Sequence, residues 1–468
     1  MRRAAALILV ALAAGCGGGE PASPPPATST VHATLVDRNG DGFLERGPGE
    51  PLSGPEGGRV LAAFGQLTDT HVRDEESPAR VPFLDRIGGP LTSTFRPHEA
   101  FSTQVLDAAV RALRRERPQA VVVTGDIVDS AQENELGQAL AVLAGDVVEP
   151  DSGGPGYAGV QAASNPDPFY FRPDNDAPRH PGALAAAQRR FRATGLGVPF
   201  YPAVGNHDVL VQGEVPATGE IEAVATGDRL VTGIDPSFQP PTLDESEAPE
   251  VVDALLTRGE LFGRAETVPA DPARRHLEPA ALVERLAAAA GVEPAAPGRL
   301  DYAFELGARV RGIVLDTANR AGGSRGLVTA DQVEWLRSQL TGDRWTVVFA
   351  HNPLEASDGG EAALAALDAA PRVAAVVAGN RHRNTIERRD GYWLIGTSSL
   401  ADFPQQARMF RLREASGGAV LETWMVDHDG RGLAGTAREL AYLDAQGGRP
   451  QGFAGRPEDR NVRLFVQP

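Results

Sequence analysis

The sequence predicts an α/β fold whose buried strands end in polar residues. Two observations support this prediction. Apolar, β-prone runs recur along the chain, and each is followed at once by polar residues. Segments with helical spacing lie between some of these runs. Strands whose carboxyl ends carry polar groups are typical of open α/β sheets, which bind ligands at that edge.

The expected strands share a high content of apolar and β-branched residues. They are Val60–Leu67, Ala120–Thr124, Phe200–Val204, Arg311–Leu315, Thr346–Ala350, Val373–Ala378 and Tyr392–Thr397. The polar residues that follow them are Asp69, Gly125-Asp126, Gly205-Asn206, Asp316, His351, Gly379-Asn380 and Ser398-Ser399. Two helices are expected between strands. They are Glu99–Glu116, which ends before Pro118, and Gln332–Leu340.

Composition excludes several classes of protein. The chain has 468 residues, 42% of them hydrophobic, so a packed core is feasible. The formal net charge of −17 disfavours a general nucleic-acid binder, because phosphates would be repelled. All 45 basic residues are arginine, which excludes a Walker P-loop and a Schiff-base lysine. Cys16 is the only cysteine, so an intramolecular disulfide and a thiolate-ligated zinc site are excluded.

The first 16 residues have the pattern of a signal peptide. Arg2-Arg3 precede the apolar run Ala4–Ala14, which is too short to span a membrane. The run leads into Leu12–Cys16, which is similar to a bacterial lipobox, and this favours lipidation of Cys16 over a simple secretory signal. Residues 17–32 are expected to form a flexible tether. The sequence therefore predicts export and a lipid anchor on the extracytoplasmic face of a bacterial membrane.

Residues 33–58 are expected to form a short extension with an Asp/Asn-rich turn. Asp37, Asn39, Asp41 and Gly42 have the spacing of the first half of a calcium loop, but position twelve is Pro48. A weak Ca²⁺ site and an ordinary turn are both open interpretations, and the turn is favoured.

Residues 59–468 are expected to form one domain with large insertions. The intervals from Asp126 to Asn206 and from Asn206 to His351 are long and contain stretches rich in Gly, Pro and acidic residues. Because the motifs lie on both sides of them, we expect insertions near residues 140–198 and 213–300.

Five motifs supply metal-ligating side chains in a fixed order. They are Asp69-Thr70-His71, Gly125-Asp126 with Asp129, Gly205-Asn206-His207-Asp208, His351, and Gly379-Asn380-Arg381-His382. Together they could hold two cations about 3.5–4 Å apart, as two-metal phosphoester chemistry requires. Mixed nitrogen and oxygen ligands without thiolate suit two divalent or trivalent ions of Mn, Fe or Zn.

This series of motifs resembles the calcineurin-like metallophosphoesterase superfamily over roughly residues 60–403. An exported bacterial branch of that superfamily is similar in its long inserts, in the stretch from Ser77–Arg80 to Leu84–Arg86, in the stretch from Pro181-Gly182 to Gly213-Glu214, and in Asp459–Val462. The resemblance implies a four-layer αββα sandwich with the site at the strand ends. It also implies hydrolysis of a phosphomonoester or phosphodiester by a dinuclear metal site, with a bridging hydroxide as the nucleophile.

The resemblance assigns roles to residues of this chain. The first metal would be held by Asp69, His71, Asp126 and His382. The second would be held by Asp126, Asn206, His351 and Asn380. His207 would assist the leaving group, and Asp129 would orient the imidazole of His207. Arg381 and Arg383 flank His382 and are candidates to bind the substrate phosphate, with ordinary solvated arginines as the alternative.

The fifth motif departs from the family pattern, which has histidine where this chain has Asn380. An amide oxygen coordinates more weakly, which predicts a weaker second site or one that prefers a harder metal. The alternative function is therefore a non-catalytic surface lipoprotein that binds metal or a phosphorylated ligand through a degenerate second site. A further alternative is an interaction module in which the metals are structural.

Overall fold

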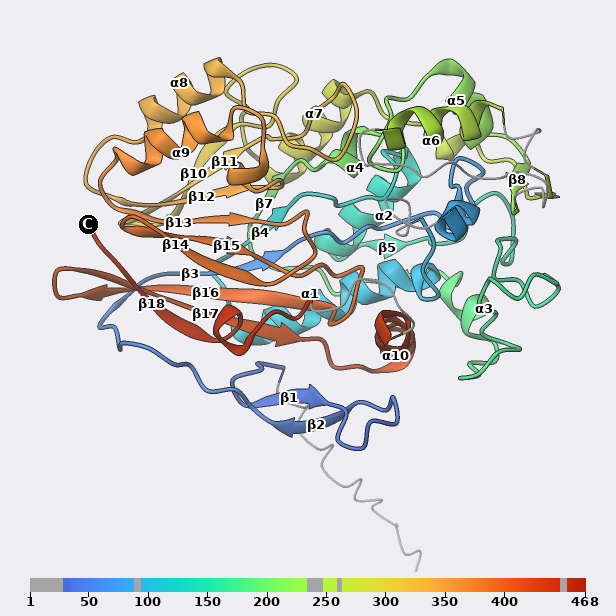
Figure 1. Ribbon diagram of the computed structural model, residues 1–468, viewed down its shortest axis with the longest axis horizontal. Helices are drawn as coiled ribbons and strands as arrows, with labels where there is room; N and C mark the ends of the chain where they lie inside the picture. The colour runs from blue at the N-terminus through green and yellow to red at the C-terminus, as the bar shows by residue number, and fades with distance from the viewer. Residues whose placement is uncertain (1–27, 88–93, 234–246, 259–262, 447–452) are drawn as a thin grey trace, which may run out of the picture.

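The computed structural model describes residues 28–87, 94–233, 247–258, 263–446 and 453–468. Two six-stranded sheets pack face to face, and helices cover their outer faces (Figure 1). Both sheets mix parallel and antiparallel strands. The result is the predicted α/β sandwich, in which the two sheets form the inner layers.

The first sheet is parallel on one side of β3 and antiparallel on the other. In spatial order it contains β18 (Val462–Val466), β17 (Gly418–Asp427), β16 (Gln406–Ala415), β3 (Val60–Leu67), β4 (Ala120–Thr124) and β7 (Phe200–Ala203). The parallel strands β3, β4 and β7 therefore bring their carboxyl ends to one edge.

The second sheet has four parallel strands at its centre. In spatial order it contains β10 (Tyr302–Gly307), β11 (Val310–Leu315), β12 (Trp345–Ala350), β13 (Val373–Ala378), β15 (Tyr392–Gly396) and β14 (Thr385–Arg389). The strands β10 and β14 run antiparallel at the two edges.

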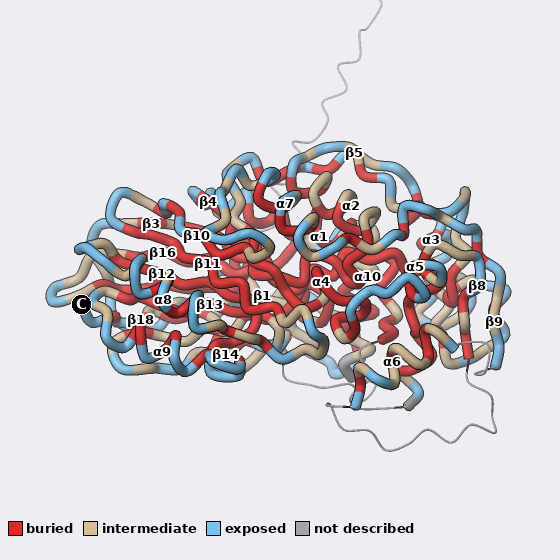
Figure 2. Tube along the Cα trace, turned by 90° about the horizontal axis from the view of Figure 1, so that it is seen from above, coloured by how far each residue is buried: buried red, intermediate tan, exposed pale blue. Residues whose placement is uncertain are grey.

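The two sheets are joined by an apolar interior, in which Phe64 of β3 packs edge-on against Phe349 of β12 with ring centroids 5.6 Å apart. The buried strands appear as the continuous red centre in Figure 2. A polar link lies within this interior. Gln66 donates to Thr124 Oγ1 at 2.8 Å and accepts from Thr397 Oγ1 at 2.7 Å, which ties β3 and β4 to the end of β15.

Amphipathic helices form the outer layers. The helix α1 (Ser102–Glu116) buries Val105, Ala109 and Leu113 in the main core and contacts β16 and β17. On the opposite face, α8 (Ala330–Gln339) and α9 (Gly360–Asp368) share a second core with β11, β12 and β13. The other helices are α2 (Glu133–Ala144), α3 (Ala183–Ala187), α4 (Asn206–Val209), α5 (Gly219–Ala225), α6 (Ala248–Thr257), α7 (Pro279–Ala290) and α10 (Gly432–Gln446).

The strands β3, β4 and β13 have the predicted bounds, and the other predicted strands differ by one residue at an end. The predicted helix Glu99–Glu116 begins with a 3₁₀ turn, Glu99–Phe101, before α1. Sequence analysis missed β10, β14, β16, β17 and β18, which complete both sheets on their antiparallel sides. In β16 the fully buried Arg408 interrupts the apolar pattern that would have identified a strand.

The two long intervals add elements to the sandwich, and α3, α5 and α6 among them lie at its right-hand end in Figure 1. The first carries β5 (Val147–Val148), β6 (Phe191–Arg192) and α3. The second carries α5, α6, α7, β8 (Arg229–Val231) and β9 (Ala265–Thr267). Its α5 and α6 form a separate small core with Phe83 and Leu84, whereas α7 packs in the main core.

At the N-terminus the predicted signal peptide, Cys16 and most of the tether lie outside the described residues. The end of the predicted tether is ordered. Thr30 donates to the carbonyl of Met425, and Asp427 donates to that of Thr28, so this segment lies along β17. The strands β1 (Ala33–Val36) and β2 (Glu45–Pro48) then form a hairpin. No helix among the described residues is long and apolar enough to cross a membrane.

Candidate metal centre

All seven predicted metal ligands lie at or just after the carboxyl ends of parallel strands. Asp69 and His71 follow β3, and Asp126 follows β4. Asn206 begins α4 after β7, His351 follows β12, and Asn380 and His382 follow β13. Because the two sheets face each other, their strand ends meet at one site. This is the edge at which α/β proteins bind ligands.

The backbone at this edge is strained. Five of the predicted ligands have left-handed φ angles, namely Asp69 (49°), His71 (40°), Asp126 (47°), Asn380 (65°) and His382 (52°). Each such residue costs about 1–3 kcal/mol and persists only where surrounding contacts hold it. Those contacts are present. The amide of Asp69 donates to the Gly125 carbonyl at 3.1 Å, and the amide of His71 donates to the Asp126 carbonyl at 3.0 Å.

Two glycines allow the loops to approach closely. A Cβ atom on Gly125 would lie 2.6 Å from His351 Nδ1, and one on Gly379 would lie 2.5 Å from Asp69 Oδ2. A side chain at either position would push a predicted ligand out of place. The glycine that precedes Asp126 and the glycine that precedes Asn380 are therefore required by the packing of the site.

Asp126 is the residue that joins the ligands. Its Oδ2 lies 3.1 Å from His351 Nε2 and 3.7 Å from His71 Nε2, and its Oδ1 accepts the backbone amide of His207 at 2.9 Å. Asn206 Oδ1 lies 3.2 Å from the same Nε2 of His351. On the other side, Asp69 Oδ1 lies 3.3 Å from His382 Nε2.

Within the described residues, three groups of His and Asp have ligand atoms within 4.8 Å of one another. They are Asp69, His71 and His382; His71, Asp126 and His207; and Asp69, Asp126 and His351. Their overlap places the predicted ligands around a common centre, as two adjacent cations require.

The hydrogen bonds of three histidine side chains are those expected of metal ligands. Nδ1 of His71 faces the Asp129 carboxylate, Nδ1 of His351 faces the Thr124 carbonyl, and Nδ1 of His382 faces Asp402. With the ring proton donated at Nδ1, a neutral imidazole presents a bare Nε2, and these Nε2 atoms point at carboxylate oxygens. The Nε2 of His71 is buried and has no hydrogen-bond partner. A positive ion between Nε2 and carboxylate satisfies both.

The electrostatics of the site favour positive charge at its centre. Burial alone would lower the pKa of His351, but Asp126 beside it raises that pKa to about 9. Burial likewise opposes ionisation of His382, yet Asp69 and Asp402 raise its pKa to about 10. For His71, burial and the neighbouring His207 lower the pKa to about 4. The carboxylates beside His351 and His382 thus stabilise a cation next to them, proton or metal, whereas burial disfavours a proton on His71.

Asp129 is placed differently from the prediction. Its carboxylate lies 3.0 Å from His71 Nδ1 and 3.9 Å from His207 Nδ1. His207 Nδ1 is instead 2.7 Å from the backbone carbonyl of Asp129. Asp129 therefore orients His71 with its side chain and His207 with its main chain, because the loop after β4 turns its carboxylate toward Arg73.

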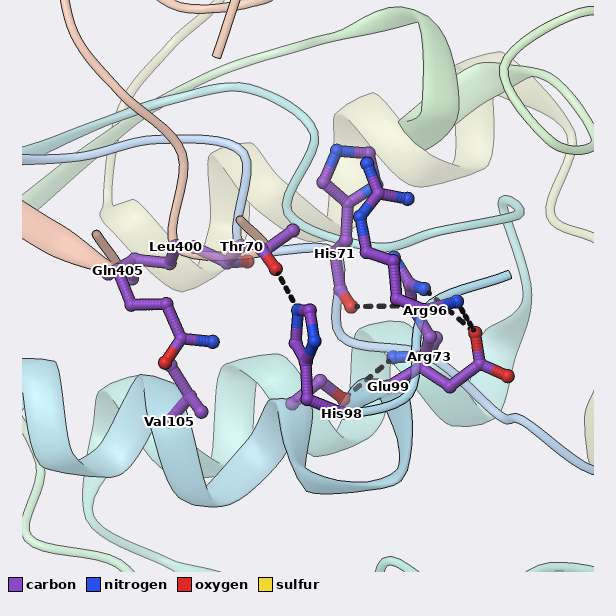
Figure 3. Close-up of a pocket in the computed structure, with 11 residues that line it drawn as sticks. Thr70, His71, Arg73, Arg96, His98, Glu99, Val105, Leu400 and Gln405 are labelled. Atoms are coloured by element: carbon purple, nitrogen blue, oxygen red, sulfur yellow. Dashed lines mark hydrogen bonds and ion pairs between the residues drawn. The ribbon is translucent and has the colours of Figure 1, made fainter. Parts of the chain in front are cut away.

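Sequence analysis missed Asp402 and Arg96, which hold the imidazole of His382 in place. Asp402 accepts from Nδ1 of His382 and is bound by Arg96 through Nε at 2.5 Å and Nη2 at 3.1 Å. The available signal was weak: Asp402 is a carboxylate a few residues after a predicted strand. Figure 3 shows Arg96, Arg73 and Glu99 beside His71, across a narrow pocket from Leu400 and Gln405.

The remaining candidates have these positions. Asn380 donates its backbone amide to Asp69 Oδ1 at 3.0 Å and is partly exposed. Arg381 is exposed and pairs with Glu355 at 3.3 Å, and Arg383 is exposed. The calcium-like loop behaves as a turn: Asp37 accepts the backbone amides of Gly40, Asp41 and Gly42.

The sequence matches the profile of a known family. The family profile described as "Calcineurin-like phosphoesterase" matches residues 62–384. No curated protein matches the sequence significantly.

Solved structures resemble the chain at low sequence identity. A dimetal phosphatase from Danio rerio is 14% identical, with 79% of this chain and 100% of that chain covered and a TM-score of 0.40. GAP50, the anchor in the inner membrane complex of Plasmodium, is 10% identical, with 79% and 85% covered and a TM-score of 0.33. A purple acid phosphatase from yellow lupin is 12% identical, with 82% and 54% covered and a TM-score of 0.32.

Proposed function

The chain belongs to the calcineurin-like phosphoesterase family, and from this membership we propose that it hydrolyses a phosphomonoester or phosphodiester at the cluster around Asp126. One observation carries the proposal. The buried carboxylates of Asp69 and Asp126 are surrounded by imidazole Nε2 atoms whose partner Nδ1 atoms are already hydrogen-bonded. This arrangement of buried carboxylates and imidazoles suits the binding of two cations.

The residues divide into two sets of ligands around a shared carboxylate. Asp69, His71, Asp126 and His382 would hold one metal, and Asp126, Asn206, His351 and Asn380 would hold the other. When bound, two such ions lower the pKa of a water molecule and neutralise phosphoryl oxygens. The donor set, which contains nitrogen and oxygen but no sulfur, suits Mn, Fe or Zn, and Asn380 makes the second position the weaker one.

His207 is the proposed donor to the leaving group. Its Nδ1 donates to the Asp129 carbonyl, and its partly exposed ring reaches the edge of the site. The imidazolium form of His207 therefore has Nε2–H free, and this atom would give its proton to the leaving oxygen. The Asp126 carboxylate, which accepts the His207 amide, keeps the ring at a fixed distance from the cluster.

Arg383 and Arg381 are the proposed contacts to the substrate phosphate. Both are exposed beside His382, in a chain that is strongly acidic overall. Arg73 and Arg96 are held by buried carboxylates and are not available for this role, whereas the pair of Arg381 with Glu355 is open to solvent, where a phosphate can compete for Arg381.

We place the protein outside the cytoplasm, anchored through a lipid on Cys16, as in the exported bacterial branch that its motifs resemble. The support is the apolar run Ala4–Ala14 and the Leu12–Cys16 segment. Thr28, which is 12 residues after Cys16 in the sequence, accepts the backbone amide of Asp427 at the end of β17. Replacing Cys16 by serine should move the protein from the membrane fraction to the soluble fraction. An unchanged distribution would contradict the anchor.

The activity is tested with aryl phosphomonoesters and phosphodiesters in the presence of Mn²⁺. Asp126→Asn should abolish hydrolysis of both. His207→Gln should lower kcat by about 10²–10³-fold, more for an ester with a poor leaving group than for a nitrophenyl ester. Hydrolysis that both variants retain would contradict the assignment. A folded protein that binds metal but cleaves neither ester would support the alternative function, in which the Asn380 site is degenerate.

A further inference from the structure

The two histidines assigned to the first metal are held differently from the other two. A carboxylate faces Nδ1 of His71 and of His382, whereas a backbone carbonyl faces Nδ1 of His351 and of His207. Resting on the proposed function, we infer that Asp402 and Asp129 are positioning residues. They make the site of Asp69, His71 and His382 bind its cation first and more tightly than the site of His351.

Asp402, which accepts from His382, is itself held in place by Arg96. Asp402 accepts from His382 Nδ1, and Arg96 binds the same carboxylate through Nε and Nη2. His98, two residues after Arg96, hydrogen-bonds to the carbonyl of Ala401 at 2.5 Å. The segment Arg96–His98 therefore holds both the carboxylate and the backbone next to it.

Asp129, which faces His71, is likewise held in place by arginines. Asp129 Oδ1 lies 3.0 Å from His71 Nδ1 and 2.9 Å from Arg73 Nη2. Arg80 Nε lies 3.5 Å from the other carboxylate oxygen. All of these side chains are at least nine-tenths buried, so their contacts are not exchanged with bulk water.

Glu99 joins the two sides. Its carboxylate binds Arg80 at 2.7 Å, contacts Arg73 at 3.4 Å and accepts the backbone amide of Arg96 at 3.0 Å. Figure 3 shows Glu99 beside Arg73 and Arg96, at the start of the helix that follows His98. The positions of Asp129 and Asp402 are thereby coupled, although 273 residues of sequence separate them (402 − 129).

A carboxylate that accepts the hydrogen bond from Nδ1 of a ligand histidine strengthens metal binding more than a backbone carbonyl does. Both fix the ring and place the proton on Nδ1, but a carboxylate also makes Nε2 more basic and adds a negative charge near the cation. The His351 site has only the neutral Thr124 carbonyl behind its imidazole, and two of its other ligands are the amides of Asn206 and Asn380. The difference in charge predicts unequal affinities.

The test is a titration of the metal-free protein with Co²⁺, followed by visible absorption and by calorimetry. The wild type should bind two equivalents in two resolved steps. Asp402→Asn should weaken the first step by about 10–100-fold and leave the second within a few-fold. The control is Asp427→Asn, because Asp427 is also a buried aspartate bound by an arginine, Arg46, and it lies at the end of β17, two strands away from β3. It should leave both steps unchanged.

A structural role for Asp402 gives a different result. If Asp402 only anchors its loop, Asp402→Asn and Asp427→Asn will both lower the melting temperature of the metal-free protein, and neither will change the affinity of the first step. That result overturns the inference. Two equal steps in the wild type overturn it too. If Asp402→Asn does not fold, Arg96→Gln provides the test, since it keeps the His382–Asp402 contact and should weaken the first step several-fold.

The titration uses no substrate, so its failure is distinguishable from failure of the proposed function. Unequal steps without hydrolysis would contradict the phosphoesterase proposal alone. Hydrolysis with two equal steps would contradict the inference alone.

Discussion

The Nε2 atom of His351 lies 3.1 Å from Oδ2 of Asp126, and both side chains are buried. The other ring nitrogen of His351 is 2.8 Å from the Thr124 carbonyl. An unprotonated Nε2 would face the carboxylate with no hydrogen between them. Either a proton or a metal ion at this position removes the conflict, and the predictions below rest on metal binding there.

Metal should stabilise the fold. A cation that binds only the folded state, at a free concentration of 100 times its dissociation constant, adds about 2.7 kcal/mol to the free energy of unfolding. Thermal unfolding of the chelated protein, with and without added Mn²⁺, measures this. The melting temperature should rise with Mn²⁺, and Asp126→Asn should abolish the response. Equal melting temperatures for the wild type in both conditions would contradict a metal centre.

Gly213 should be required for the position of His207. Its φ is +71°, and an added Cβ would lie 2.3 Å from Cδ2 of His207. Gly213→Ala should therefore lower kcat with an aryl phosphate by about tenfold or more, because the ring that donates to the leaving group is displaced.

The matched control for Gly213 is Gly182→Ala. Gly182 has a similar φ of +76°, but nothing lies within 4 Å of its Cβ position. Both substitutions should lower the free energy of unfolding by about 1–2 kcal/mol through backbone strain. Only Gly213→Ala should change kcat. Equal kcat values in the two variants would show that a side chain at position 213 does not disturb catalysis through His207.

Restoring histidine at position 380 should strengthen the second metal site. The residue has a left-handed φ of 65°, which histidine adopts more readily than most residues. An imidazole in place of the amide should tighten the second step of a Zn²⁺ titration by about tenfold. Asn380→Ala should shift the same step in the opposite direction. If neither substitution moves that step, residue 380 is not a ligand.

The stability of the metal-free protein should fall at alkaline pH because of Glu76. Burial, and then the negative charge of Glu75, raise the pKa of Glu76 to about 9. A carboxyl whose pKa is higher in the folded state contributes stability that is complete below its unfolded pKa. That contribution is lost as the pH rises through the folded value. The free energy of unfolding should therefore decrease between pH 6 and pH 9.

Urea unfolding of Glu76→Gln in the presence of chelator measures this contribution. Glutamine stays neutral, so the decrease between pH 6 and pH 9 should be smaller than in the wild type by at least about 1 kcal/mol. The exposed Glu293→Gln is the control and should keep the wild-type decrease. A decrease of wild-type size in Glu76→Gln would show that another group titrates.

The grouping of the candidate ligands could be predicted because their positions depend on local sequence. Each follows a buried strand directly, so the spacing between an apolar run and Asp126 or His351 already places the side chain at the sheet edge. The central strands could be predicted for the same reason. The antiparallel strand β16 could not, because it contains Arg408, whose charge is buried against Asn384 and the Asp459 carbonyl.

The residues that hold the ligands depend on contacts between distant segments. Arg96 reaches Asp402 across 306 residues of sequence, and no local pattern marks either residue. For a similar reason the sequence paired Asp129 with His207 alone, whereas its carboxylate lies 3.9 Å from Nδ1 of His207 and 3.0 Å from Nδ1 of His71. The sequence indicates that a carboxylate follows the strand, but the direction of that carboxylate is set by Arg73 and Arg80, which arrive from a different loop.

The most direct test of a two-cation phosphoesterase is the rate of bis(nitrophenyl) phosphate and nitrophenyl phosphate hydrolysis as metal-free protein is titrated with Mn²⁺. We expect no hydrolysis without metal, little after the first equivalent and full activity at the second, with no activity at any concentration in Asp126→Asn. Absence of hydrolysis of both esters by folded protein saturated with Mn²⁺, Fe²⁺ or Zn²⁺ would contradict the account.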